Sequence, residues 1–93
     1  MFLKLLICVL LPCIGWAETL LLYYSSTCPY SREVLDYLKN AGRTLPMVDV
    51  REDLEGKEKL KSYGTPASVP CLVIDEQPLY DSGAIINWLS THP

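Results

Sequence analysis

From residue 19 onward, short apolar runs alternate with segments of helical periodicity. The first run, residues 19–25, is continuously apolar and aromatic, which is typical of a strand at the centre of a sheet. An amphipathic helix is predicted to begin at Pro29 and to stop at Gly42, because its apolar residues recur at helical spacing: Tyr30, Val34, Leu35, Leu38 and Ala41. The pattern therefore opens with a buried strand followed by a helix.

A second strand and a second helix follow. Residues 46–50 form a short apolar run, which predicts a strand. Residues 53–63 are charged on most sides and are closed by Gly64, so they predict a largely exposed helix. These two elements extend the alternation of strand and helix.

The C-terminal part predicts a hairpin and a final helix. Residues 71–80 contain two short strands around an Asp75-Glu76 turn, and Pro78 favours an edge strand because proline has no N–H to pair. We expect Ser82 to be the N-cap of a helix whose apolar face is formed by Ile85, Ile86, Trp88 and Leu89. The order βαβαββα with a right-handed crossover predicts an α/β domain, in which a four-stranded mixed sheet carries helices on both faces.

Residues 1–17 have the pattern of a secretory signal peptide. Lys4 precedes an uncharged apolar span, and the small residues Gly15 and Ala17 fit a cleavage site before Glu18. A membrane anchor fits less well, because the stretch between Lys4 and Glu18 is shorter than the about 20 residues that a spanning helix needs. We therefore predict export to a periplasmic or other extracytoplasmic compartment, with no stable membrane association after cleavage.

Cleavage would leave one small domain, residues 18–93, with Cys28 and Cys71 as its cysteines. A lipidated Cys13 is an alternative, but Pro12 directly before it matches such a site poorly. Two cysteines do not make a disulfide scaffold, and together with the single histidine at position 92 they do not supply an intrachain zinc site. The net charge of −3 disfavours nucleic-acid binding, because such proteins present a basic surface.

The candidate chemistry lies between the first predicted strand and helix, at Cys28-Pro29-Tyr30-Ser31. The free N–H groups and the dipole of a helix N-terminus favour a thiolate over a thiol. Pro29 suits the first helical turn because it has no N–H to leave unpaired. Ser31 stands where a second cysteine would form a redox disulfide with Cys28, so the second sulfur must come from elsewhere.

Three motifs in this order, Cys28-Pro29-Tyr30-Ser31, Ser68-Val69-Pro70 and Asp81-Ser82, resemble the thioredoxin-like fold in its glutaredoxin form. They resemble the N-terminal, glutathione-binding domain of glutathione transferases equally well. The resemblance covers about residues 19–93. It implies that glutathione is the co-substrate and that Cys28 is the catalytic nucleophile, with Pro29 and Ser31 supporting the helix N-terminus around it.

The resemblance also implies how glutathione is held. Pro70 would be a cis proline beside the sulfur, and the backbone of Val69 would pair with the peptide-like backbone of glutathione. Ser82 and nearby backbone N–H groups would take the γ-glutamyl carboxylate, and Asp81 would take the ammonium. Tyr30 would line the cleft, with packing in the core as its alternative.

The chain departs from the glutaredoxin pattern at two places. Glutaredoxins commonly have a lysine three residues before the nucleophile, where this chain has Ser25. Arg32, one turn into the helix, either substitutes in part for that lysine or is a solvated surface charge. Cys71 is either a small buried residue on the face of Val73 or a resolving thiol for Cys28.

These residues lead to the hypothesis of a monothiol glutaredoxin that acts through Cys28 on glutathionylated or disulfide-containing proteins, and that is a monomer without metal. One alternative is a transferase-like glutathione-binding domain without conjugating activity, since transferases bind their electrophile against a helical second domain, which these residues do not supply. Another is a non-catalytic binding module, or a dimer that shares an iron–sulfur cluster through Cys28 and glutathione.

Overall fold

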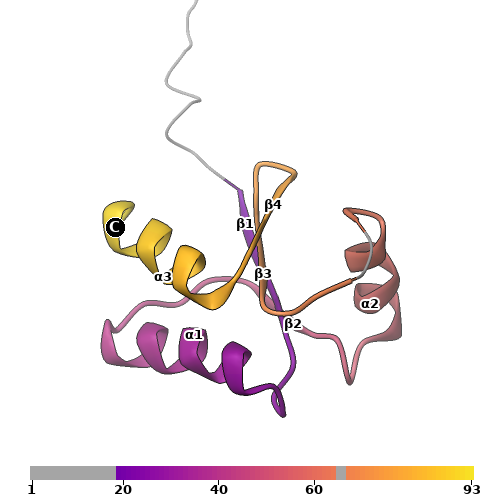
Figure 1. The fold of residues 1–93 in the computed structure, drawn as a ribbon, viewed down its shortest axis with the longest axis horizontal. Helices are drawn as coiled ribbons and strands as arrows, with labels where there is room; N and C mark the ends of the chain where they lie inside the picture. Colours follow the sequence, from indigo (N-terminus) through magenta and orange to yellow (C-terminus); the bar gives the residue numbers. More distant parts are fainter. Residues whose placement is uncertain (1–18, 65–66) are drawn as a thin grey trace, which may run out of the picture.

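A mixed sheet of four strands forms the middle of the fold (Figure 1). The computed structural model describes residues 19–64 and 67–93. The strand order is β2-β1-β3-β4, with the β1–β2 pair parallel and the other two pairs antiparallel. The strands are β1 (Leu20–Tyr24), β2 (Met47–Asp49), β3 (Cys71–Ile74) and β4 (Gln77–Tyr80). The continuous apolar run thus lies at the centre of the sheet, and β4 is an edge, as predicted.

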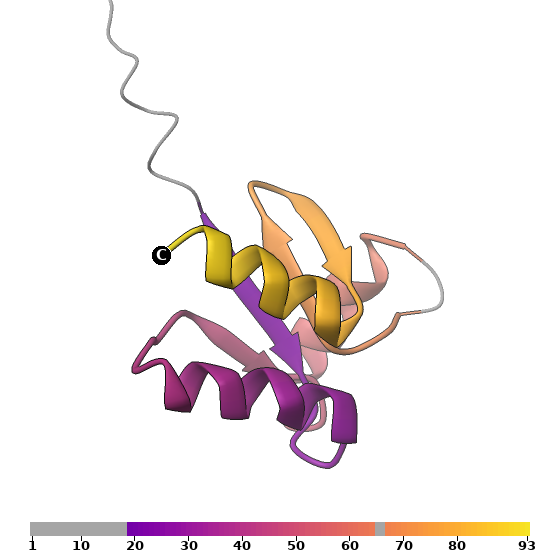
Figure 2. The same ribbon diagram turned by 60° about the vertical axis from the view of Figure 1, so that its left-hand side comes forward.

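Three helices cover the two faces of this sheet (Figure 2). They are α1 (Pro29–Asn40), α2 (Leu54–Lys61) and α3 (Ser82–Thr91). Helices α1 and α3 lie side by side over one face, and α2 lies over the other. The predicted order βαβαββα and the predicted helices on both faces are confirmed.

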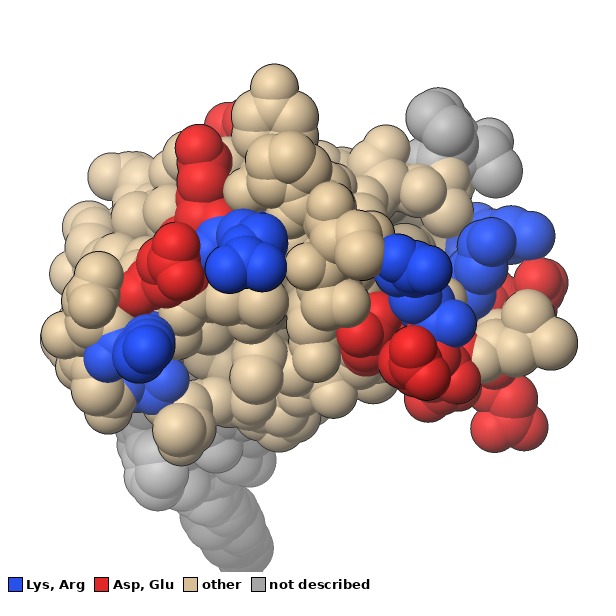
Figure 3. Space-filling model, turned by 90° about the horizontal axis from the view of Figure 1, so that it is seen from below, with Lys and Arg blue, Asp and Glu red and all other residues tan. Residues whose placement is uncertain are grey.

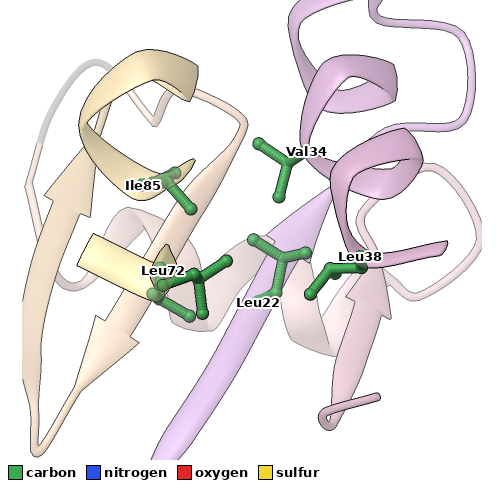
Figure 4. Close-up of a cluster of buried hydrophobic side chains, with 6 residues drawn as sticks. Leu22, Val34, Leu38, Leu72 and Ile85 are labelled. Atoms are coloured by element: carbon green, nitrogen blue, oxygen red, sulfur yellow. The ribbon is translucent and has the colours of Figure 1, made fainter. Parts of the chain in front are cut away.

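The two faces of the sheet have separate cores, because neighbouring residues of a strand point to opposite sides. On the α1–α3 side, Leu22 and Leu72 from the strands meet apolar side chains of both helices (Figure 4). On the α2 side, the buried residues are Tyr23, Leu60, Cys71 and Val73. Burying one leucine side chain contributes about 1.5–3 kcal/mol, so each small core stabilises the layers on its own side.

Local signals fix the ends of the elements. Proline at the first position of α1 has no N–H to leave unpaired, and Gly42, with a φ of 64°, follows the C-terminus of this helix. Asp53 caps α2, since its carboxylate accepts a hydrogen bond of 2.9 Å from the N–H of Gly56. In the predicted turn of the β3–β4 hairpin, Asp75 and Glu76 have φ angles of 48° and 71°, as residues of a tight hairpin turn do.

The N-cap of α3 is Asp81, so the prediction of Ser82 at this position is wrong. The carboxylate of Asp81 accepts a hydrogen bond of 3.1 Å from the N–H of Ala84. Aspartate and serine are comparable capping residues. The choice between them is made by the backbone, which gives Asp81 a φ of 80° and leaves the hydroxyl of Ser82 free to reach another helix.

The predicted signal peptide, residues 1–17, lies outside the described residues. Among the residues that are described, no helix has the length and apolar character needed to cross a bilayer. On the described part of the face shown in Figure 3, basic and acidic side chains are intermingled rather than gathered into a basic stripe.

Candidate functional site

Cys28 lies at the N-cap position of α1, at the end of the short loop that follows β1. Its backbone N–H donates to the carbonyl of Ser25 (3.1 Å), and its own carbonyl accepts from the N–H of Arg32 (3.0 Å). These bonds fix the residue against the first turn of the helix, while its side chain stays only half-buried. The thiol is therefore held at a helix N-terminus and still open to attack.

This position lowers the pKa of the Cys28 thiol. The main cause is the backbone N–H of Ser31, which stabilises the thiolate, and the hydroxyl of Ser31 and the N–H of Tyr30 act in the same direction. Partial burial opposes them by penalising the charged form.

Besides lowering the pKa of Cys28, Ser31 stabilises the loop that precedes α1. It is fully buried, and its hydroxyl accepts a hydrogen bond of 3.2 Å from the backbone N–H of Ser25. Ser25 is itself only 7% exposed. The position where glutaredoxins commonly have a lysine thus holds a small, buried side chain.

The opposite wall of the site is the segment before β3. The peptide bond between Val69 and Pro70 is cis, as the resemblance implied. The Sγ atom of Cys28 lies 3.9 Å from the carbonyl oxygen of Val69, at the outer limit of a thiol hydrogen bond. Two segments 41 residues apart in the chain thus bring the thiol next to a peptide backbone.

A cleft of about 260 Å³ runs from this wall to the start of α3. It is lined by Tyr30, Ser68, Val69, Pro70, Asp81 and Ser82. The structure thus brings together the residues that the resemblance assigned to glutathione binding. Tyr30 is 63% exposed, which excludes its alternative role in the core.

The far end of the cleft carries an unusual backbone and an unexpected contact. Asp81 has φ 80° and ψ 120°, a combination that residues with a side chain rarely adopt. The hydroxyl of Ser82 donates a hydrogen bond of 2.6 Å to the Oε1 atom of Glu33 on α1. Glu33 was not predicted as a site residue, because no local sequence pattern links residues 49 positions apart.

Arg51 is a second residue that the sequence patterns did not identify. It follows β2, and its Nη1 atom donates a hydrogen bond of 2.9 Å to the hydroxyl of Thr27, the neighbour of Cys28. A cation is thus bonded to the loop in which the family lysine is absent. Arg32, considered as a substitute for that lysine, is exposed.

Cys71 lies in a different environment. It is fully buried in the core on the α2 side together with Val73, as its place in the strand predicted. Burial raises the pKa of its thiol to about 11. Both Cys71 and Cys28 are free cysteines. Across residues 19–64 and 67–93, no group of three or more His, Cys, Asp or Glu side chains is placed to hold a metal ion.

Comparison with known proteins agrees with this geometry. The family model described as Glutaredoxin matches residues 20–79. A probable maleylacetoacetate isomerase from Caenorhabditis elegans is 38% identical over 72 residues, which are 76% of this chain and 33% of the isomerase. The chain thus spans about a third of this curated relative.

Two solved structures show the same arrangement of elements. A glutathione S-transferase from Methylobacillus flagellatus, crystallised with glutathione bound, has a TM-score of 0.66 and 28% identity, over 81% of this chain and 37% of the transferase. A buckwheat glutaredoxin–glutathione complex has a TM-score of 0.61 and 13% identity, over 81% and 71% of the two chains. The second likeness shows the fold alone.

The fold is therefore the thioredoxin-like fold that glutaredoxins and the N-terminal part of glutathione transferases share. The match of the family model to residues 20–79 covers more than half of the sequence. The chain belongs to the glutaredoxin family.

Proposed function

We propose that this protein is a glutathione-dependent thiol–disulfide oxidoreductase of the monothiol glutaredoxin type. The observation that carries the proposal is the position of Cys28: its Sγ atom lies at a helix N-terminus and 3.9 Å from the carbonyl of Val69, which is in the wall of the cleft. Val69 lines the cleft, where its backbone would pair with an extended, peptide-like ligand. Glutathione is such a ligand.

The reaction has two thiol–disulfide exchanges. In the first, the Cys28 thiolate attacks the glutathione sulfur of a protein–glutathione mixed disulfide, the old S–S bond breaks, and the protein thiolate leaves and takes up a proton. In the second, the thiolate of another glutathione attacks the glutathione sulfur now bound to Cys28. This releases oxidised glutathione and restores the Cys28 thiolate. Overall, the protein sulfur of the mixed disulfide is reduced to a thiol, and the sulfur of one free glutathione is oxidised to the disulfide level.

The lowered pKa of Cys28 acts mainly in the second exchange. A lower pKa provides more thiolate for attack, but nucleophilicity falls with a Brønsted coefficient of about 0.4–0.5, which removes part of the gain. As a leaving group, however, a thiol of lower pKa departs faster. The N–H groups of Ser31 and Tyr30 therefore favour the return of the free enzyme.

The ends of glutathione would lie along the cleft. The Val69 backbone would pair with its cysteinyl part, and Tyr30 would cover it from the rim. Ser82 and Gly83 are in the first turn of α3, so their backbone N–H groups have no acceptor within the helix. These N–H groups would donate hydrogen bonds to the γ-glutamyl carboxylate. The carboxylate of Asp81 would take the ammonium. The strained backbone of Asp81 supports this role, since such conformations cluster at ligand sites.

The test is glutathione-dependent reduction of a glutathionylated peptide by the purified protein. We expect Cys28→Ser to lower the rate by more than about a thousandfold, as removal of a nucleophile does in other enzymes. Cys71→Ala is the matched control and should keep the wild-type rate, because this thiol is buried on the α2 side. Activity that survives Cys28→Ser would sink the proposal.

A second candidate function is a glutathione-binding domain of the transferase type. It is favoured by the 38% identity to the isomerase and by the 28% identity to the transferase that holds glutathione. The same assay separates the two. Glutathione binding without any reduction of the peptide, in the wild-type protein, would favour the binding domain.

We also propose that the protein is exported by residues 1–17 and acts as a monomer outside the cytoplasm. The support is the pattern of Lys4, the apolar span and the small residues before Glu18. Mass spectrometry of the protein isolated from its source would test this. An N-terminus at Glu18 is expected, and a mature chain that begins at Met1 would contradict export by cleavage.

A further inference from the structure

Glu33 is not part of the cleft lining, but it is hydrogen-bonded to Ser82, which is. Helices α1 and α3 lie side by side over one face of the sheet (Figure 2), and apolar side chains of both helices belong to the same core. The hydroxyl of Ser82 donates its hydrogen bond to Glu33 at 2.6 Å, a length typical of a bond to a charged acceptor. A serine hydroxyl has a single proton to donate. While this bond exists, Ser82 has no proton left for a ligand carboxylate.

The contact also changes the charge at this end of the cleft. Ser82 is 5% exposed and is part of the lining, so the Glu33 carboxylate lies one hydrogen bond away from the ligand space. Asp81 supplies a second carboxylate in the lining itself. The six lining residues include no lysine or arginine. A ligand that brought only a negative charge here would meet two carboxylates.

We propose that Glu33 is a specificity-determining residue, which with Asp81 makes this end of the cleft accept the γ-glutamyl group only as a zwitterion. This inference rests on the proposed function. The ligand carboxylate binds the free N–H groups at the start of α3. The ligand ammonium offsets the charge of the two carboxylates, and an analogue without the ammonium leaves that charge unbalanced.

The test compares glutathione with glutaryl-cysteinylglycine, which is glutathione without its amino group. Both compounds carry the thiol and both carboxylates, so they differ in the positive charge and in little else. KM and kcat are measured for the peptide mixed disulfide of each compound, with glutathione as the reductant in every assay, because the compound in the mixed disulfide is the one that Cys28 transfers into the cleft. The proteins are the wild type, Glu33→Gln and Glu55→Gln. The glutamine at position 33 keeps an acceptor for Ser82 and removes only the charge.

We expect the wild type to prefer glutathione by about 10- to 100-fold in kcat/KM, the range of one hydrogen bond to a charged group. Glu33→Gln should reduce that preference by about 3- to 10-fold, through KM and with kcat unchanged, as the loss of part of such an interaction does. Glu55→Gln is the matched control: it removes the same charge from an exposed position on α2, at the other face of the sheet, and should leave the preference as it is.

Two results would overturn the role of Glu33 while leaving the proposed function in place. One is an equal preference in the wild type and Glu33→Gln. The other is an equally lower KM for both compounds in Glu33→Gln, which would mean that the charge of Glu33 repels the ligand carboxylate whether or not the ammonium is present. If the wild type does not use glutathione at all, the proposed function itself fails, and the inference fails with it.

Discussion

The two cysteines of the described chain show how far the same side chain can differ between two regions of one small domain. Cys28 is half-buried at a helix N-terminus, where backbone N–H groups lower the pKa of its thiol. Cys71 is fully buried in β3, where desolvation raises the pKa of its thiol to about 11. The fold thus holds one thiol partly exposed at a helix N-terminus and buries the other as an apolar side chain.

Desolvation is the main influence on the pKa of the Cys71 thiol and raises it, while the backbone of Leu79 and the side chain of Tyr80 act in the opposite direction. Its partner across the β3–β4 pair is Tyr80, whose hydroxyl is buried and has no hydrogen-bond partner among the described residues. Burial raises the pKa of Tyr80, and it also raises the pKa of Tyr23 in the same core. The α2 side of the sheet is therefore a region where ionisation is costly, in contrast to the loop that holds Cys28.

The largest expected difference between the two regions is in alkylation. With iodoacetamide at neutral pH, Cys28 should react at or above the rate of a free cysteine. Cys71 should react at least about 1,000-fold more slowly, because it must wait for an opening of the core that costs about 5 kcal/mol or more. Peptide mass mapping over time measures both rates. Comparable labelling rates for the two cysteines would contradict the difference in reactivity between Cys28 and Cys71.

A smaller effect is expected from removing the hydroxyl that ties the Cys28 loop together. Ser31→Ala leaves the buried N–H of Ser25 without its acceptor, and an unsatisfied buried group costs about 1–3 kcal/mol of unfolding free energy. The pKa of Cys28 should also rise, because the hydroxyl of Ser31 lowers it. Urea denaturation and the pH dependence of alkylation measure the two effects.

Ser26→Ala is the matched control for this change, because Ser26 is an exposed serine of the same loop. It should alter neither the unfolding free energy nor the pKa of Cys28. An Ser31→Ala protein as stable as this control would show that the loop does not depend on the hydrogen bond.

The smallest effect is expected in alkaline solution. The Cys71 proton is held to about pH 11 in the folded chain but is released near the ordinary value of 9.0 in the unfolded chain. Between these values the unfolded state ionises first, so the free energy of unfolding should fall as the pH rises. Cys71→Ala should show a shallower fall, since among the described residues Tyr23 and Tyr80 are then the groups whose raised pKa acts in this direction. Parallel slopes for the two proteins would contradict the raised pKa.

Much of the fold could be predicted from the sequence because its signals are local. The alternation of apolar residues placed Cys71 and Val73 on one face of the sheet, and Pro29 marked the start of α1. The cap of α3 could not be predicted in the same way. Asp81 and Ser82 both have capping side chains, and the φ of 80° that decides between them depends on how the chain leaves β4.

The site could be predicted only as far as motifs identify it. The motifs placed Tyr30, Pro70 and Asp81 around one cleft, although nothing in their spacing shows that they meet. The bonds from Ser82 to Glu33 and from Arg51 to Thr27 join residues 49 and 24 positions apart. Such pairs arise from the packing of whole elements, and no local pattern encodes them.

The two edges of the sheet limit how the protein can associate. At one edge, β2 has only three residues and follows Pro46. At the other, Pro78 in β4 removes a donor from the row of backbone groups that faces outward. A strand from another molecule would find a short template on one side and an interrupted one on the other. Both edges of the sheet therefore disfavour the addition of further strands from other molecules.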